Sequence, residues 1–175
     1  PIHGECIDGY FSYHAVQNES KYRIQLGEDL PIFTRNQFHE ISSQFKDESI
    51  VFICVNDDNI ENTLKEFDKN LNECQRVILS GGYQFPNGLP YKVSVIYPLF
   101  SFSKNSDVKW NLIPIFIESP NTLILELLRN LNLENVNYLN SQQRNLLHVA
   151  AVFANNFTNS MFIAAQEILK LSPEL

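Results

Sequence analysis

Short runs of apolar and β-branched residues alternate with segments of helical periodicity along most of the chain. The short runs predict strands at residues 30–33, 50–55, 76–79, 93–97, 113–117 and 136–139. The intervening segments predict helices at residues 37–45, 57–69 and 120–131. Because strands that alternate with helices build βαβ units, we expect an α/β fold with a Rossmann-like, doubly wound and mostly parallel sheet.

Individual residues sharpen three of these elements. The run at 50–55 is apolar throughout, which is typical of a strand buried on both faces. Asp57 or Asp58 can cap the helix that follows, and Pro120 suits the first turn of the helix at 120–131. The stripe that packs the first of these helices on the sheet is Ile60, Leu64, Phe67 and Leu71.

From residue 141 the pattern is purely helical, and it stays so to residue 171. At about 100° per residue, this helix has one polar and one apolar edge. The polar edge is either a solvated surface or one side of a site. Its members are His148, Val152, Asn155, Asn159, Phe162 and Gln166. The apolar edge consists of Leu146, Ala150, Phe153, Ala154, Phe157, Met161, Ala164 and Ile168.

The apolar edge of this helix needs a cover. It packs either on its own sheet or on a partner, and the four residues after position 171 are too few to cover it. We therefore expect more chain or a second subunit, with a homodimer formed through the C-terminal helix. We divide the chain into a Rossmann-like dinucleotide-binding domain at residues 1–140 and the start of an all-α C-terminal domain at residues 141–175.

The composition is that of an ordinary water-soluble domain. Of 175 residues, 44% are hydrophobic and 19% charged, and the formal charge is −7, with 13 scattered Lys and Arg residues. This balance argues against a nucleic-acid partner. No apolar stretch approaches the roughly 20 residues of a membrane span, and the N-terminus has no signal pattern. The three cysteines lack metal-site spacing, so we expect a cytoplasmic protein without a membrane partner.

Ligands of open α/β sheets bind beyond the carboxyl ends of the strands, so polar residues after strands are candidate cofactor contacts. Gly9 and Ser12 lie where a glycine-rich dinucleotide turn belongs, although only one of the three glycines of such a turn is present. Thr34 and Arg35 follow the strand at 30–33, where an acidic residue would bind an NAD ribose. A guanidinium and a hydroxyl suit a 2′-phosphate instead, which indicates NADP.

Two further strand ends supply small polar groups and accessible backbone. One strand end has Val55, Asn56, Asp57 and Asp58, and the next has Ser80, Gly81 and Gly82. Together they are expected to form the floor under a nicotinamide ribose. Each of these candidate contacts has an alternative interpretation as an ordinary cap or turn.

Hydride transfer requires little acid–base chemistry from a protein, because the cofactor carries the difficult step. His148 is the side chain of the polar edge that is suited to give one proton, since histidine exchanges protons near neutral pH. The alternative is a histidine that only packs. No G-x-S-x-G elbow surrounds Ser80, and the four histidines form no zinc signature, so we expect neither a hydrolytic triad nor a metal.

Six segments together resemble one known family. They are Phe33-Thr34-Arg35, residues 51–60, Ile78-Leu79-Ser80-Gly81-Gly82, residues 97–104, residues 113–118 and residues 144–157. In this order and spacing the chain resembles NADP oxidoreductases that join a Rossmann domain to a helical C-terminal domain of uncharacterised role. They belong to the 6-phosphogluconate dehydrogenase-like and pyrroline-5-carboxylate reductase-like superfamily.

The resemblance implies NADP(H) as cofactor and a small-molecule substrate. Family members continue with further helices, so the helical domain is truncated here relative to the family. Superfamily members that act on hydroxy acids use a lysine on the interdomain helix, but no lysine occurs between Lys109 and Lys170. This leaves reduction of an imine or carbonyl, with His148, Asn155 and Ser80 around the reacting carbon. The alternative is a catalytically silent nucleotide-binding or dimerising module, which the single glycine and the missing lysine favour.

Overall fold

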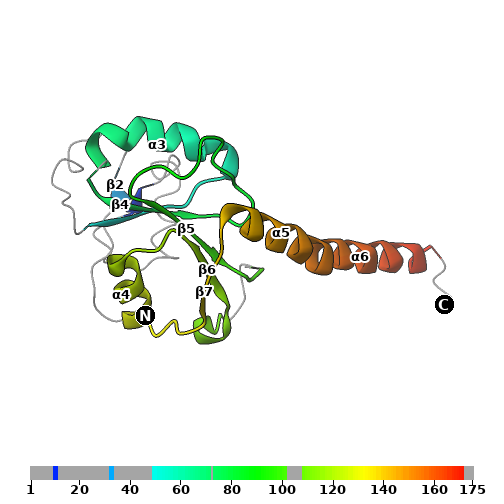
Figure 1. The fold of residues 1–175 in the computed structure, drawn as a ribbon. Helices are drawn as coiled ribbons and strands as arrows, with labels where there is room; N and C mark the ends of the chain where they lie inside the picture. Colours follow the sequence, from blue (N-terminus) through cyan, green and yellow to red (C-terminus); the bar gives the residue numbers. More distant parts are fainter. Residues whose placement is uncertain (1–9, 12–31, 34–48, 72, 102–107, 172–175) are drawn as a thin grey trace.

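The computed structural model describes residues 10–11, 32–33, 49–71, 73–101 and 108–171. Its centre is a five-stranded sheet of order β3-β4-β5-β6-β7 (Figure 1). The strands are β3 (Ile50–Ile53), β4 (Gln75–Leu79), β5 (Val93–Pro98), β6 (Ile115–Glu118) and β7 (Val136–Tyr138). β1 (Tyr10–Phe11) and β2 (Ile32–Phe33) form a separate parallel pair.

The sheet confirms the predicted mostly parallel, Rossmann-like architecture. β3, β4 and β5 run parallel to one another, and β6 is parallel to β7. The antiparallel exception is the pair β5 and β6. The chain reverses between these two strands through a connection that includes the 3-10 helix η1 (Trp110–Leu112). The predicted edge strand at 136–139 is confirmed as β7.

Helices α3 (Asp57–Leu71) and α4 (Thr122–Asn130) cover opposite faces of the sheet (Figure 1). Neighbouring residues on a strand point to opposite faces, so the sheet carries two cores. On the α3 side, the buried cluster is Ile53, Ile60, Leu64, Ile78, Val93 and Val95. On the α4 side, it is Val77, Ile96, Ile113, Ile115, Ile117, Ile124 and Leu128. Burial on both faces explains the consecutive apolar residues of the central strands, such as Val77 and Ile78 of β4.

The structure corrects several element boundaries. Asp57 and Asp58 lie in the first turn of α3, where their charge still complements the helix dipole. Pro120 precedes α4, which Asn121 caps by accepting a hydrogen bond from the Ile124 N–H at 3.0 Å. The strand predicted at 50–55 ends at Ile53. Phe52 is 45% exposed, so this strand is not buried on both faces. The predicted helix at 37–45 lies outside the described residues.

A long helical rod follows β7. It comprises α5 (Ser141–Ala151), the π-helical segment η2 (Val152–Phe157) and α6 (Thr158–Leu169). Asn140 opens it with a capping box, in which its side chain accepts from the Gln143 N–H and the Gln143 side chain accepts from the Asn140 N–H. Figure 1 shows α5 against the body of the protein and α6 projecting away from it. The helix was predicted, but its π-helical segment was not.

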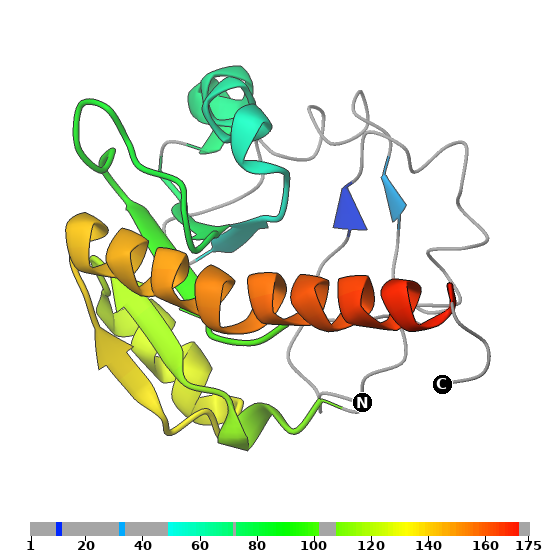
Figure 2. The same cartoon turned by 90° about the vertical axis from the view of Figure 1, so that its right-hand side faces the viewer.

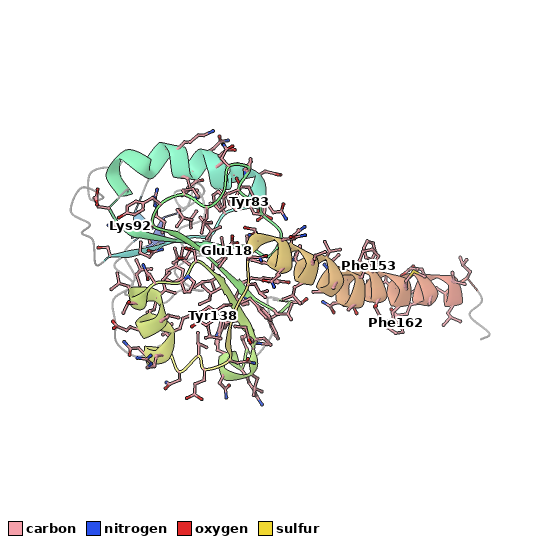
Figure 3. All side chains as sticks on the ribbon, in the orientation of Figure 1. Tyr83, Lys92, Glu118, Tyr138, Phe153 and Phe162 are labelled. Atoms are coloured by element: carbon pink, nitrogen blue, oxygen red, sulfur yellow. The ribbon has the colours of Figure 1, made fainter. Side chains whose placement is uncertain are left out.

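The apolar edge of the rod is exposed. Leu146, Phe153 and Met161 are 62%, 64% and 72% exposed, and Phe153 lies on the part of the rod that projects from the body (Figure 3). Packing of this edge on the protein's own sheet, the alternative considered from the sequence, is therefore wrong. Within the described residues, none of the helices combines the length and apolarity that a bilayer span requires.

Candidate functional site

The carboxyl ends of β3, β4 and β5 meet at one edge of the sheet, because the three strands are parallel. The rod passes across this edge (Figure 2). Its first helix, α5, therefore lies beside the residues that follow the three strands. We call this edge of the sheet the rim, and α5 lies beside it. It is the place at which open α/β sheets bind ligands.

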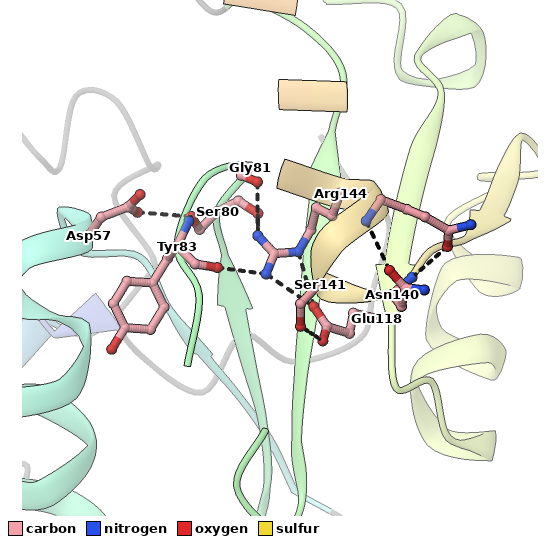
Figure 4. A network of polar contacts seen from close by, with 9 residues as sticks. Asp57, Ser80, Gly81, Tyr83, Glu118, Asn140, Ser141 and Arg144 are labelled. Carbon is pink, nitrogen blue, oxygen red and sulfur yellow. Dashed lines mark hydrogen bonds and ion pairs between the residues drawn. The ribbon is translucent and has the colours of Figure 1, made fainter. Parts of the chain in front are cut away.

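Asp57 and Ser80 join the ends of two neighbouring strands. The Ser80 hydroxyl donates to Asp57 Oδ1 at 2.9 Å and accepts from the Tyr83 N–H at 3.0 Å (Figure 4). Ser80 is buried, and its one hydroxyl proton is used in the hydrogen bond to Asp57. The structure thus presents Ser80 as a group that orients the carboxylate.

His148 lies directly against the two glycines that follow Ser80. A methyl group on Gly81 would lie 2.5 Å from His148 Nδ1, and one on Gly82 would lie 3.0 Å from His148 Cδ2. Both distances are shorter than van der Waals contact, so the close approach of α5 depends on the missing side chains. The same imidazole contacts Tyr97 at the end of β5, with 3.4 Å between His148 Nδ1 and Tyr97 Oη.

Asn155 lies farther along the rod, in the π-helical segment. Its side-chain amide donates to the Ser101 hydroxyl, and its Oδ1 accepts from the Asn159 side chain at 3.3 Å. His148 and Asn155 therefore both contact residues at or just beyond the end of β5. Single-turn π-helical insertions in α-helices are frequent at functional sites.

Arg144 fixes α5 to the rim and is completely buried. Its guanidinium donates to Glu118 Oε2 at 3.0 and 3.1 Å and to the carbonyls of Gly81 at 2.8 Å and Tyr83 at 2.6 Å (Figure 4). The Ser141 hydroxyl donates to the other oxygen of Glu118. The buried ion pair is thus well hydrogen-bonded, as a desolvated charge pair must be. It connects α5 to β6 and to the loop after β4.

The structure brings together four residues predicted from the sequence: Asp57, Ser80, Gly81 and His148. Asn155 lies farther along the rod, Val55 is half-buried between β3 and α3, and Asn56 is exposed immediately before α3. The remaining predicted cofactor contacts lie outside the described residues: Gly9, Ser12, Thr34 and Arg35.

Several residues of the site were not assigned a role from the sequence: Tyr97, Ser101, Glu118 and Arg144. One signal was available for Arg144, because it is the only Lys, Arg, Asp or Glu between residues 141 and 166. A lone cation in so long an uncharged helix points to a buried partner. Nothing comparable identifies Glu118, which simply ends a strand.

The charges and polar groups of the rim determine which parts of a dinucleotide it can accept. Asp57 and Asp58 place negative charge at the start of α3, which disfavours a phosphate there. Asp57 Oδ1 is bonded to Ser80, and Oδ2 lies 3.7 Å from the position that a Gly82 side chain would occupy. A carboxylate oxygen and an exposed amide, that of Asn56, suit hydroxyl and carboxamide groups. The described rim therefore offers partners for the hydroxyl and amide groups of a ligand and disfavours a phosphate at the start of α3.

The rim shows no donor set for a metal. In the described part of the chain, no three His, Cys, Asp or Glu side chains cluster closely enough to hold an ion.

Comparisons with known proteins agree with the fold. The model of a domain of unknown function, DUF2520, matches residues 113–172. A crystal structure named as a putative NADP oxidoreductase from Bacteroides fragilis matches with a TM-score of 0.66 and 23% identity, over 94% of this chain and 62% of that one. A protein from Thermotoga maritima matches with a TM-score of 0.53 and 19% identity, over 95% and 63% of the two chains. No curated protein matches the sequence.

These similarities define the class of the protein: an α/β, Rossmann-like domain followed by a long helix. The chain spans less than two thirds of each solved structure.

Proposed function

We propose that the protein is an NADP-dependent oxidoreductase that acts on a small imine or carbonyl compound. The observation that carries this proposal is the position of His148 at the carboxyl rim, against Gly81 and Gly82. A proton donor at the edge where the fold class binds nucleotides is what a reductase needs. The name of the Bacteroides fragilis structure supports the same activity.

In this proposal the residues of the rim have separate roles. Bound NADPH would supply the hydride. His148 holds the proton that the reduced substrate receives, and Asn155 orients the substrate or the nicotinamide carboxamide. Ser80 holds Asp57 in place, so that its free oxygen can accept a ribose hydroxyl. Val55, Asn56 and Gly81 line the floor, while Gly9, Ser12, Thr34 and Arg35 bind the phosphates and the adenosine.

The cofactor proposal is tested by titrating the full-length protein with NADPH and NADH by calorimetry. NADPH is expected to bind with a micromolar Kd. Arg35→Ala is expected to weaken NADPH binding about tenfold and to leave NADH binding unchanged, because it removes the partner of the 2′-phosphate. Lys109→Ala, an exposed cation on the β5–β6 connection, is the matched control. Equal losses for both nucleotides would contradict the proposed phosphate contact.

A catalytically silent interaction module remains the second candidate, and the exposed apolar edge of the rod is the observation that favours it. NADPH oxidation on addition of a cyclic imine or a carbonyl compound separates the two candidates. Turnover supports the enzyme, whereas nucleotide binding without turnover across such a panel supports the module.

We also propose that residues 1–140 and 141–175 belong to different domains and that the rod joins two copies of the chain in a homodimer. From residue 145 to residue 166 the rod has no charged residue apart from the titratable His148, so two copies can approach without charge repulsion. Light scattering is expected to give twice the chain mass. Phe157→Lys, which places a charge on the exposed edge, is expected to give the monomer mass. A wild-type monomer would contradict the proposal.

A further inference from the structure

Tyr97 contacts His148 through both its ring and its hydroxyl. The two rings meet edge to face, with centroids 5.6 Å apart and an interplanar angle of 74°. Tyr97 Oη lies 3.4 Å from His148 Nδ1, which is the length of a long hydrogen bond. Burial raises the pKa of Tyr97, so the phenol keeps its proton throughout the physiological range. The hydroxyl is therefore available as a donor.

The surroundings of His148 Nδ1 leave little room for a hydrogen-bond partner other than Tyr97. The backbone of Gly81 closes one side, since a methyl group there would lie 2.5 Å from this nitrogen. Among the described residues, the hydrogen-bond partner that the structure gives to Nδ1 is Tyr97. The Tyr97 hydroxyl can donate, and the lone pair of an unprotonated Nδ1 is an acceptor for it.

The other ring nitrogen has a different environment. His148 Nε2 lies 3.3 Å from the position that a Gly82 side chain would occupy, and Asp57 Oδ2 lies 3.7 Å from the same position. His148 Nε2 and Asp57 Oδ2 therefore border the same position beside Gly82, on the side of the imidazole away from Tyr97.

We propose that Tyr97 is a positioning residue, whose hydroxyl donates to Nδ1 of neutral His148 and so holds the imidazole in the tautomer that carries its proton on Nε2. Which nitrogen of an imidazole is protonated is set by the hydrogen bond that the other nitrogen makes. The consequence, delivery of the proton from Nε2 into the rim, rests on the proposed function. The tautomer itself exists without cofactor or substrate.

The tautomer is measured by nitrogen NMR of the ¹⁵N-labelled, cofactor-free protein at mildly alkaline pH, where imidazoles are neutral. The His148 signals are assigned by their loss in His148→Gln. In the wild type, Nδ1 is expected to resonate as a bare nitrogen and Nε2 as a protonated one. Tyr97→Phe keeps the ring contact and removes the hydroxyl, and it is expected to shift the tautomer ratio about three- to tenfold toward protonated Nδ1.

Tyr138→Phe is the matched control, because Tyr138 is an exposed tyrosine on β7. It is expected to leave the ratio unchanged. A protonated Nδ1 in the wild type would overturn the proposal, as would an unchanged ratio in a folded Tyr97→Phe protein. The wild-type spectrum decides the first point, so once the His148 signals are assigned the test does not depend on the stability of Tyr97→Phe. It also needs no NADPH, so absence of nucleotide binding would contradict the proposed function and leave this result standing.

Discussion

Replacing Arg144 with methionine is expected to lower the free energy of unfolding by about 3–5 kcal/mol. Arg144 is completely buried, and its removal leaves the Glu118 carboxylate desolvated without a counter-charge. The carbonyls of Gly81 and Tyr83 lose their donors at the same time. Urea denaturation followed by circular dichroism measures the change, since the midpoint shifts while the slope is retained.

Two further variants make this result specific. Lys170→Met removes a cation whose ion pair with Glu167 is exposed, and it is expected to cost less than about 1 kcal/mol. Adding Glu118→Leu to the Arg144→Met protein removes the unpaired charge, so part of the lost stability is expected to return. A loss no greater than that of Lys170→Met would contradict the assigned role of the buried pair.

Replacing His148 with glutamine is expected to lower kcat by about a hundred- to ten-thousand-fold, with the KM for NADPH unchanged. Glutamine can still hydrogen-bond to Tyr97 but cannot deliver a proton. The change in absorbance of NADPH on its oxidation measures both constants for the wild type and the variant. Because His148 packs against Gly81, the thermal midpoint of the variant is measured alongside.

Gln166→Ala is the control for this experiment. Gln166 is exposed on the same helical rod but lies beyond Asn155, away from the rim. It is expected to have the kcat of the wild type. A His148→Gln protein that is folded and also turns over at the wild-type rate would show that the proton comes from another group.

The sheet was largely predictable because strands buried on both faces are encoded locally. Val77 and Ile78 point to opposite faces, and both are fully buried, so the sequence there contains no polar alternation. The reversal between β5 and β6 was not predictable in this way. A strand of the composition of β6 could occupy its place in the sheet in either direction. The direction is set by the segment between β5 and β6, whose sequence has no helical or strand periodicity.

Part of the candidate site was predictable, because open α/β sheets bind ligands at the carboxyl ends of their strands. Residues that follow parallel strands meet at one edge, which placed Asp57, Ser80 and Gly81 together. For the polar edge of the long helix, the sequence left open a solvated surface or one side of a site, and the structure places His148 of that edge against Gly81. The apolar edge of the helix was visible too, but whether it packs on the sheet depends on where the helix points.

Contacts between distant segments account for what the sequence did not show. Arg144 and Glu118 are 26 positions apart, and only the folded chain shows that each neutralises the other. Tyr97 and His148 are 51 positions apart. His148 was a candidate from its own segment, but Tyr97 was not, and their contact depends on how α5 crosses the sheet. The π-helical segment likewise has no local signal in its composition.

The central claim is that the rim beneath α5 binds NADPH, and NMR mapping of the titration tests it most directly. The backbone amides of Gly81 and Gly82 and the ring signals of His148 are followed as NADPH is added to the ¹⁵N-labelled protein. The account predicts saturable shifts at these positions with a micromolar Kd, while amides on the far side of the sheet, such as those of α4, stay in place. Saturable binding that shifts other residues and leaves the rim unchanged would contradict it, as would no binding at about millimolar NADPH.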